Sequence, residues 1–137
     1  MNITLTETPD PAVREVIVAG LVAYNEGHAG PRNGQPLAVL LEGEEGRPVG
    51  GLWGVTAYGW LFTELLFIPE ALRGGGRGAE VLAMAEAEAR ARGCVGAWLD
   101  TFEFQARGFY ERQGYGVFGQ IDDYPPGFAR YFMKKVF

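Results

Sequence analysis

The chain has 137 residues, of which 47% are hydrophobic and 21% charged, with a net charge of −5 and one cysteine. This length and composition indicate a single globular domain spanning residues 1–137. The acidic balance, without any Lys/Arg-rich block, argues against a nucleic-acid surface. One cysteine excludes an internal disulfide and gives no metal-site spacing, and no apolar run is long enough to span a membrane. Without a signal-peptide pattern, we expect a cytoplasmic protein with no membrane partner.

The N-terminal third predicts one strand and one helix. Residues 2–6 alternate between apolar and polar side chains, which is typical of a short strand. Asp10 and Pro11 form a helix-start signal, with Asp10 as the N-cap and Pro11 at the first helical position. Apolar residues then recur at helical spacing over residues 12–26, and a polar, glycine-rich loop is expected at residues 27–34.

The middle of the chain predicts three strands followed by a helix and a fourth strand. The three strands fall at residues 36–42, 48–58 and 60–68 and are joined by short glycine-containing turns. Such short connections favour an antiparallel meander. An alanine-rich helix is expected at residues 79–92 and a buried strand at 95–101. Because a helix connects this strand to the preceding one, the two are predicted to run parallel.

The C-terminal residues predict a helix at 104–113 and strands at 115–121 and 128–136, with a loop at 122–127. The element order is therefore strand, helix, three strands, helix, strand, helix and two strands. This order indicates a mixed α/β fold with a largely antiparallel sheet.

A glycine-rich loop joins the third of the meander strands to the alanine-rich helix, in the stretch Arg73-Gly74-Gly75-Gly76-Arg77-Gly78. Glycines at such a junction expose backbone N–H groups at the positive end of the helix, an arrangement that binds phosphate. The nucleotide-binding P-loop is excluded, because Gly78 is followed by Ala79 and Glu80 and not by Lys and Ser/Thr.

The loop also fits the dinucleotide-binding fingerprint G-x-G-x-x-G/A, through Gly74, Gly76 and Ala79. Asp100 lies at a strand end about 20 residues further on, as that fingerprint requires. Against this reading, five residues including Pro69 separate the strand from Gly74, where a tight turn is expected. The antiparallel meander upstream also disfavours it, so a dinucleotide-binding domain is the weaker alternative.

A third pattern, R-x-x-G-x-G, is matched by Arg73, Gly76 and Gly78. A second motif follows downstream, in the stretch Ala106-x-x-Phe109-Tyr110-Glu111-x-x-Gly114-Tyr115. With these two motifs, the chain resembles the GNAT superfamily of N-acetyltransferases over residues 36–120. The resemblance implies a GNAT-like fold with a mostly antiparallel sheet of roughly six to seven strands, parallel fourth and fifth strands and flanking helices. It also implies acetyl-CoA as the acetyl donor and a primary amine of a small molecule or peptide as the acceptor.

The resemblance assigns a cofactor-binding segment. The backbone of the glycine loop is expected to hold the pyrophosphate of acetyl-CoA, and the edge of the preceding strand is expected to hold the pantetheine arm, with an N–H near Phe67 facing the thioester. These positions are Leu66, Phe67, Ile68, Arg73, Gly74, Gly75, Gly76, Arg77, Gly78 and Ala79. Where the family often has an Asn, this chain has Glu103, so whether Glu103 replaces that side-chain contact is open.

Two residues are candidates for proton transfer. Tyr110 is the candidate general acid for the departing thiolate, and Glu64 is the candidate base for the amine. Tyr110 as a core aromatic and Glu64 as a solvent-facing strand residue are the structural alternatives. Asp100 and Glu103 are weaker candidates. A non-catalytic acyl-CoA-binding or sensing module that keeps the loop without turnover is the alternative function.

The acceptor site is expected between the 25–34 loop, the third and fourth strands and the 122–128 loop. Aromatic rings and carboxylates there suit a cationic amine, and the candidates are Trp53, Tyr58, Trp60, Asp123 and Tyr124. The identity of the amine and the oligomeric state stay open, and a sheet edge at residues 128–137 is consistent with a homodimer.

Overall fold

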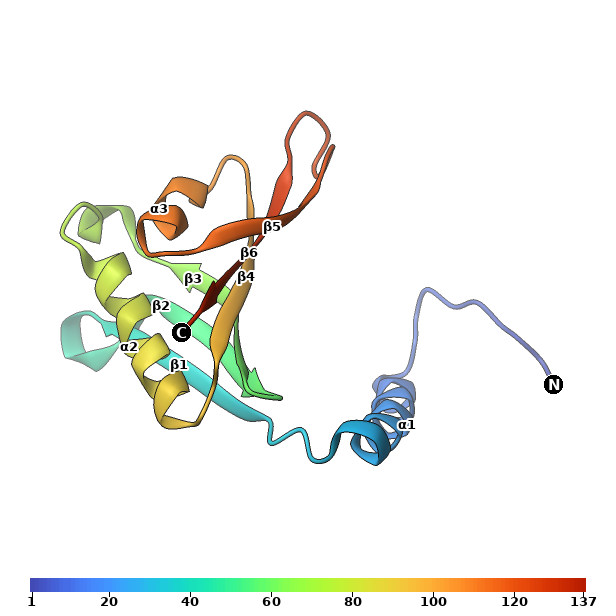
Figure 1. Ribbon diagram of the computed structural model, residues 1–137. Coiled ribbons are helices and arrows are strands. Elements are labelled where there is room, and N and C mark those ends of the chain that lie inside the picture. The colour runs from blue at the N-terminus through green and yellow to red at the C-terminus, as the bar shows by residue number, and fades with distance from the viewer. The chain divides into compact units, whose positions relative to one another are not determined.

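The computed structural model describes residues 1–137, and its contacts divide the chain into two compact units, residues 1–32 and residues 33–137. The first unit contains helix α1 (Pro11–Ala29), and the second contains the whole sheet (Figure 1). The family resemblance noted above rests on residues of the second unit.

Helix α1 begins where the sequence predicts. The Asp10 carboxylate accepts a hydrogen bond from the Ala12 N–H at 2.9 Å, and Pro11 occupies the first helical turn. The helix does not stop at residue 26, however, and the predicted loop at residues 27–34 is wrong for its first three residues. One internal glycine costs a helix only about 1 kcal/mol. The helix ends at Gly30, whose φ of 77° ordinary residues avoid.

Residues 2–6 form no strand, so this prediction is wrong. The alternating pattern is present, but a strand also needs a neighbouring strand to pair with its backbone groups. All these residues are exposed. None of the chain's helices, α1 included, is both long and apolar enough to cross a membrane.

The second unit is a six-stranded sheet with two α-helices and two short 3-10 turns. Neighbouring strands follow the order β1-β2-β3-β4-β6-β5. The elements are β1 (Gln35–Glu42), η1 (Glu44–Gly46), β2 (Pro48–Ala57), β3 (Trp60–Phe67), η2 (Glu70–Leu72), α2 (Arg77–Ala91), β4 (Gly96–Phe102), α3 (Arg107–Arg112), β5 (Gly116–Ile121) and β6 (Arg130–Val136). All neighbours are antiparallel except β3 and β4, so the predicted fold class is confirmed. Strand β6 is paired on both sides, so the expected free sheet edge at residues 128–137 is wrong, and the edge strands are β1 and β5.

Strands β3 and β4 separate part of the way along their length. Their parallel pairing runs only from Trp60 opposite Gly96 to Phe62 opposite Trp98, although β3 continues to Phe67. Just beyond this point the register between β2 and β3 shifts, which makes Glu64 the extra residue of a β-bulge. The end of β3 therefore keeps β2 as a neighbour on one side and has no strand on the other.

Helix α2 packs across the sheet with its apolar face toward the core. Its buried residues include Leu82, Ala85 and Ala89, which lie in one cluster with Leu61 and Leu99 of the central strands. Small alanine side chains let the helix lie close to the sheet. The core thus fixes the start of α2 at the end of β3, where the glycine loop connects them (Figure 1).

Candidate active site

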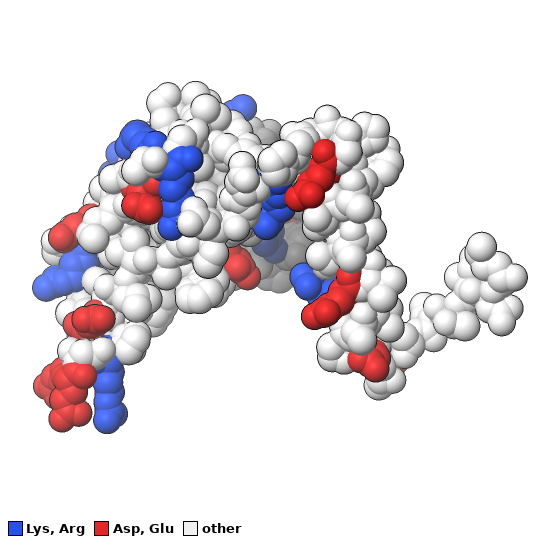
Figure 2. All heavy atoms as spheres, turned by 90° about the horizontal axis from the view of Figure 1, so that it is seen from below, with Lys and Arg blue, Asp and Glu red and all other residues white.

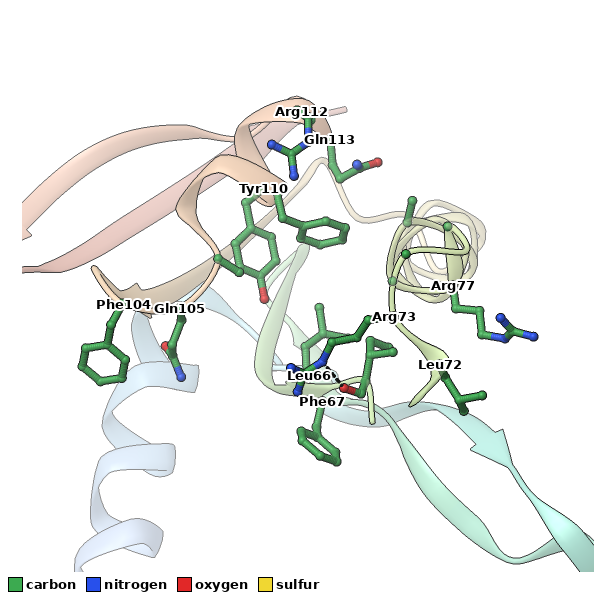
Figure 3. Close-up of a pocket in the computed structure, with 17 residues that line it drawn as sticks. Leu66, Phe67, Leu72, Arg73, Arg77, Phe104, Gln105, Tyr110, Arg112 and Gln113 are labelled. Carbon is green, nitrogen blue, oxygen red and sulfur yellow. Dashed lines mark hydrogen bonds between the residues drawn. The ribbon is translucent and has the colours of Figure 1, made fainter. Parts of the chain in front are cut away.

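A pocket of about 720 Å³ lies where β3 leaves β4, enclosed by the end of β3, the glycine loop, the first turn of α2 and helix α3 (Figure 3). Its lining residues are Leu66, Phe67, Ile68, Leu72, Arg73, Gly74, Gly76, Arg77, Gly78, Ala79, Phe104, Gln105, Ala106, Phe109, Tyr110, Arg112 and Gln113. The two motifs, far apart in the sequence, therefore face each other across one cavity.

The first turn of α2 presents backbone donors to this pocket. Gly76 is the N-cap at φ 79° and provides no side-chain cap. The first hydrogen bond of the helix runs from the Glu80 N–H to the Gly76 carbonyl at 3.0 Å. The N–H groups of Arg77, Gly78 and Ala79 therefore have no acceptor within the helix, and these three residues line the pocket. Such donors, together with the helix dipole, favour a bound anion.

The charges around the pocket have one sign. Among its lining residues are three arginines, Arg73, Arg77 and Arg112, and no carboxylate, although the whole chain carries a net charge of −5. On the face seen in Figure 2, by contrast, basic and acidic side chains are interspersed and often lie beside one another. The pocket is thus electrostatically suited to a negatively charged ligand.

Arg73 also holds the loop in place. Its Nε donates to the carbonyl of Ile68 at 2.8 Å, and its guanidinium lies 6.0 Å from the centre of the Phe67 ring. Figure 3 shows Arg73 turned back onto the end of β3, whereas the side chain of Arg77 extends away from Tyr110. Arg73 is therefore bonded to the strand that forms one wall of the pocket.

Tyr110 projects from α3 into the pocket opposite β3. Its ring packs edge-on against Phe109 at 5.1 Å and Tyr115 at 5.9 Å, and its hydroxyl points toward Leu66 and Phe67 (Figure 3). Burial, and secondarily the negative charge of Asp100, raise the pKa of Tyr110 to about 12. The hydroxyl, like that of an ordinary tyrosine, is protonated at neutral pH and can donate a proton or hydrogen bond.

Two of the expected site residues do not line the pocket. Gly75 lies in the loop but outside the wall, and Glu64 is exposed at the bulge of β3. Two weaker candidates have structural partners: Asp100 forms an ion pair with Arg130, and Glu103 Oε2 accepts from the Ala129 N–H at 2.8 Å.

None of the expected acceptor residues lines the pocket either. Trp53, Tyr58 and Tyr124 are exposed, and Asp123 accepts a 3.4 Å hydrogen bond from the Gly127 N–H within its own loop. Of the 25–34 segment expected to border the acceptor site, residues 25–29 belong to α1.

Several residues of the pocket wall were not predicted from the sequence, namely Leu72, Phe104, Gln105, Arg112 and Gln113. Arg112 and Gln113 occupy the unspecified positions of the second motif, and Phe104 and Gln105 directly precede it. Leu72 likewise directly precedes the first motif. Being next to or within a motif was the only feature of the sequence that could have identified these residues. The Gln105 side chain is also structural, since its Oε1 accepts from the Phe102 N–H at 2.8 Å.

A helix start with free N–H groups, an open strand edge and a buried tyrosine therefore lie in one pocket that suits an anionic ligand. The sequence profile of the Acetyltransferase (GNAT) family matches residues 10–115. The chain belongs to this family and is an acetyltransferase that transfers an acetyl group from acetyl-CoA to an amine.

Its relatives agree with this assignment. The chain is 39% identical to Acetyltransferase Atu2258 of Agrobacterium fabrum (strain C58) over 100% of both chains. It is 44% identical to Blasticidin-S acetyltransferase of Streptomyces morookaense over 94 residues, which are 68% of this chain and 69% of that protein. An acetyltransferase structure from Bacillus cereus ATCC 14579 superposes with a TM-score of 0.86 at 28% identity, covering 98% of each chain.

Proposed function

We propose that Tyr110 is the general acid of this N-acetyltransferase and that the pocket it faces is the acetyl-CoA site. The observation that carries the proposal is the placement of a protonated tyrosine and a set of unpaired helix N–H groups in the same pocket. The pocket fits the donor in charge, since phosphates are anionic and its three charged side chains are all arginines.

The loop and strand would hold the donor in two places. The N–H groups of Arg77, Gly78 and Ala79 suit the pyrophosphate. The open edge of β3 at Leu66–Ile68 offers backbone groups to the amides of the pantetheine arm, as a neighbouring strand would. The N–H of Phe67 is proposed to face the carbonyl oxygen of the thioester, where negative charge develops.

Acetyl-CoA supplies an acetyl group activated as a thioester. The attacking amine must be neutral and must lose a proton as the amide forms, while the sulfur leaves as a thiolate. We propose that Tyr110 protonates this thiolate. Glu64 is proposed to accept the amine proton through water, because it lies outside the pocket wall.

The acceptor is proposed to be an amine of a small molecule or peptide. The relationship to Blasticidin-S acetyltransferase supports a small molecule.

We also propose that the protein works in the cytoplasm, as a homodimer built on edge strand β5 (Gly116–Ile121), without a nucleic-acid or membrane partner. The net charge of −5 supports the last point, because both of those partners present anionic surfaces.

An acetylation assay over a panel of amines, with free CoA as the readout, tests the proposal. Tyr110→Phe should lower kcat by about 100-fold and leave the KM for acetyl-CoA unchanged. Tyr115→Phe is the matched control, because that hydroxyl bonds to Glu86 outside the pocket, and it should keep kcat. An unchanged kcat in Tyr110→Phe would remove its role. Acetyl-CoA binding without transfer to any amine would favour the sensing module.

A Glu64→Gln variant tests the base separately. If Glu64 accepts the amine proton, kcat/KM should fall most at low pH, where fewer amine molecules are already neutral. A profile of kcat/KM against pH that matches the wild type would contradict this role.

A further inference from the structure

Four aromatic side chains form a contiguous cluster where β4 ends and the β5–β6 loop returns. Phe102 and Phe104 stack with ring centres 5.2 Å apart and an angle of 11°. Tyr124 lies 5.7 Å from Phe102, and Phe128 meets Phe104 edge-on at 5.1 Å. We call these four residues the aromatic platform. None of the four has a catalytic role in the scheme above, although Phe104 also lines the pocket.

The platform is open to solvent. The exposed fractions are 56% for Phe104, 44% for Phe128 and 42% for Tyr124. Neighbouring exposed aromatic rings are unfavourable in water and commonly mark a binding surface. For Phe104 the geometry is specific: one ring face is stacked on Phe102, and an exposure of 56% leaves much of the ring accessible.

The platform continues the wall of the pocket. Phe104 lines the pocket together with Gln105 and Tyr110 (Figure 3). A molecule whose amine reaches the acetyl group near Tyr110 therefore has the exposed ring of Phe104 beside it. This continuity points to the acetyl acceptor as the occupant of the platform.

The rings are held in place without a ligand. Arg130 lies 5.0 Å from the centre of Phe102 and 4.7 Å from that of Tyr124, and it is ion-paired with Asp100. The Tyr124 N–H donates to the Phe128 carbonyl at 2.9 Å, which closes the loop. A platform that is already ordered loses little conformational entropy when a ligand binds.

The loop is also fastened to β4. The Glu103 N–H donates to the Ala129 carbonyl, and the Glu103 carboxylate accepts from the Ala129 N–H, each at 2.8 Å. Four carboxylates near the platform already have a partner within the protein: Glu103 in this pair of hydrogen bonds, Asp100 with Arg130, Asp122 with Gln120 and Asp123 with the Gly127 N–H. What the platform offers to a ligand is mainly ring surface.

Accessible aromatic faces prefer planar, unsaturated rings, which they bind by offset or edge-on stacking. We propose that the aromatic platform is the acceptor subsite and that it selects an amine carried on a short chain from a planar aromatic or heteroaromatic ring. This inference rests on the proposed function, because it places the acceptor amine in the pocket of Tyr110.

Three amines test the inference: 2-phenylethylamine, 2-cyclohexylethylamine and ethylamine. The first two have the same chain and differ in the planarity of the ring. We expect kcat/KM to favour 2-phenylethylamine over its cyclohexyl analogue by about 3- to 10-fold, the size of a typical ring–ring interaction. In Phe104→Leu the ratio of kcat/KM for 2-phenylethylamine to that for 2-cyclohexylethylamine should fall to about 1. Because Phe104 also lines the acetyl-CoA pocket, kcat/KM for ethylamine is measured alongside, so that any general loss of activity is separated from the loss of this preference.

Phe118→Leu is the matched control variant. Phe118 is a 54% exposed aromatic residue on β5 that belongs neither to the platform nor to the pocket wall. It should keep the preference for 2-phenylethylamine. Equal use of the two ring amines by the wild type, or a preference that survives in Phe104→Leu, would overturn the inference.

A binding measurement separates this inference from the proposed function. Calorimetric titration of 2-phenylethylamine into the protein loaded with CoA involves no acetyl transfer. We expect binding in the wild type and in Phe118→Leu, weakened 3- to 10-fold in Phe104→Leu. Binding of this kind without acetylation of any amine would contradict the proposed function and leave the platform supported. Absent binding, or equal binding in all variants, would overturn the platform.

Discussion

Gly78 in the first turn of α2 and Phe109 in α3 lie in direct contact. A Cβ built on Gly78 would lie 3.2 Å from Cζ and 3.3 Å from Cε1 of the Phe109 ring. The glycine loop and the second motif therefore meet at one point, with Tyr110 next along the chain. The missing side chain at Gly78 is what allows the two helices to approach this closely.

The effect of a substitution at Gly78 on stability and kcat should grow with the size of the new side chain. Gly78→Ala gains about 1 kcal/mol of helix propensity, which offsets the small displacement of the Phe109 ring, so stability and kcat should stay near wild type. Gly78→Val should push the ring away and misplace Tyr110, lowering kcat by roughly 10-fold or more. Thermal unfolding and steady-state kinetics measure both effects. A valine variant with full kcat would show that the contact does not position Tyr110.

Gly76 and Gly75 make a matched pair in the loop. Gly76 has a φ of 79°, which costs any other L-residue about 1–2 kcal/mol. Gly75 has no such φ, and its nearest neighbour is the flexible end of the Arg77 side chain at 3.0 Å. Gly76→Ala should therefore lower the free energy of unfolding by about 1–2 kcal/mol and weaken acetyl-CoA binding several-fold, while Gly75→Ala changes neither substantially. Denaturant unfolding and calorimetry test this, and equal effects would contradict it.

The buried carboxylate of Glu86 should be important for stability. It accepts hydrogen bonds from Lys135 Nζ at 2.6 Å and from the Tyr115 hydroxyl at 3.0 Å. Glu86→Ala leaves both partners unpaired and should lower the free energy of unfolding by about 2–4 kcal/mol. Glu88→Ala is the control, since its ion pair with Arg92 is partly exposed and should be worth under about 1 kcal/mol. A Glu86→Ala variant as stable as Glu88→Ala would refute this.

Stability should fall in alkaline solution. Burial raises the pKa of both Tyr110 and Tyr115 above the ordinary value of 10.0, that of Tyr110 to about 12. Between pH 10 and the raised pKa values, these tyrosines are ionised in the unfolded state but still protonated in the folded state. Unfolding therefore becomes more favourable as pH rises through this range. The free energy of unfolding should decrease from pH 10 upward, less steeply in Tyr110→Phe. A free energy that is flat between pH 10 and 12 would contradict the prediction.

The sequence predicted the elements of the sheet well because each has its own local signal. The alanine-rich run marks α2, and Gly114 ends α3 at a φ of 95°. The segment at residues 2–6 had the same kind of local pattern, yet it forms no strand because pairing is not encoded locally. The end of α1 was misplaced because one internal glycine is a weaker signal than Gly30 followed by Pro31.

The site was accessible from sequence only where residues fall within a motif. Phe104, Phe128 and Phe102 carry no motif, and their clustering depends on the β5–β6 loop returning beside β4. The engagement of Glu103 by the Ala129 N–H likewise depends on two segments 26 residues apart. Such contacts are fixed by the topology and not by local sequence.

The location of the acetyl-CoA site is tested most directly by an NMR titration of the ¹⁵N-labelled protein with CoA. The largest amide shifts are predicted at Gly76, Gly78 and Ala79 and along Leu66–Ile68, with smaller shifts in α3. The amide of Glu45, in the turn between β1 and β2, should not move. Shifts centred elsewhere, or none at saturating CoA, would contradict the account.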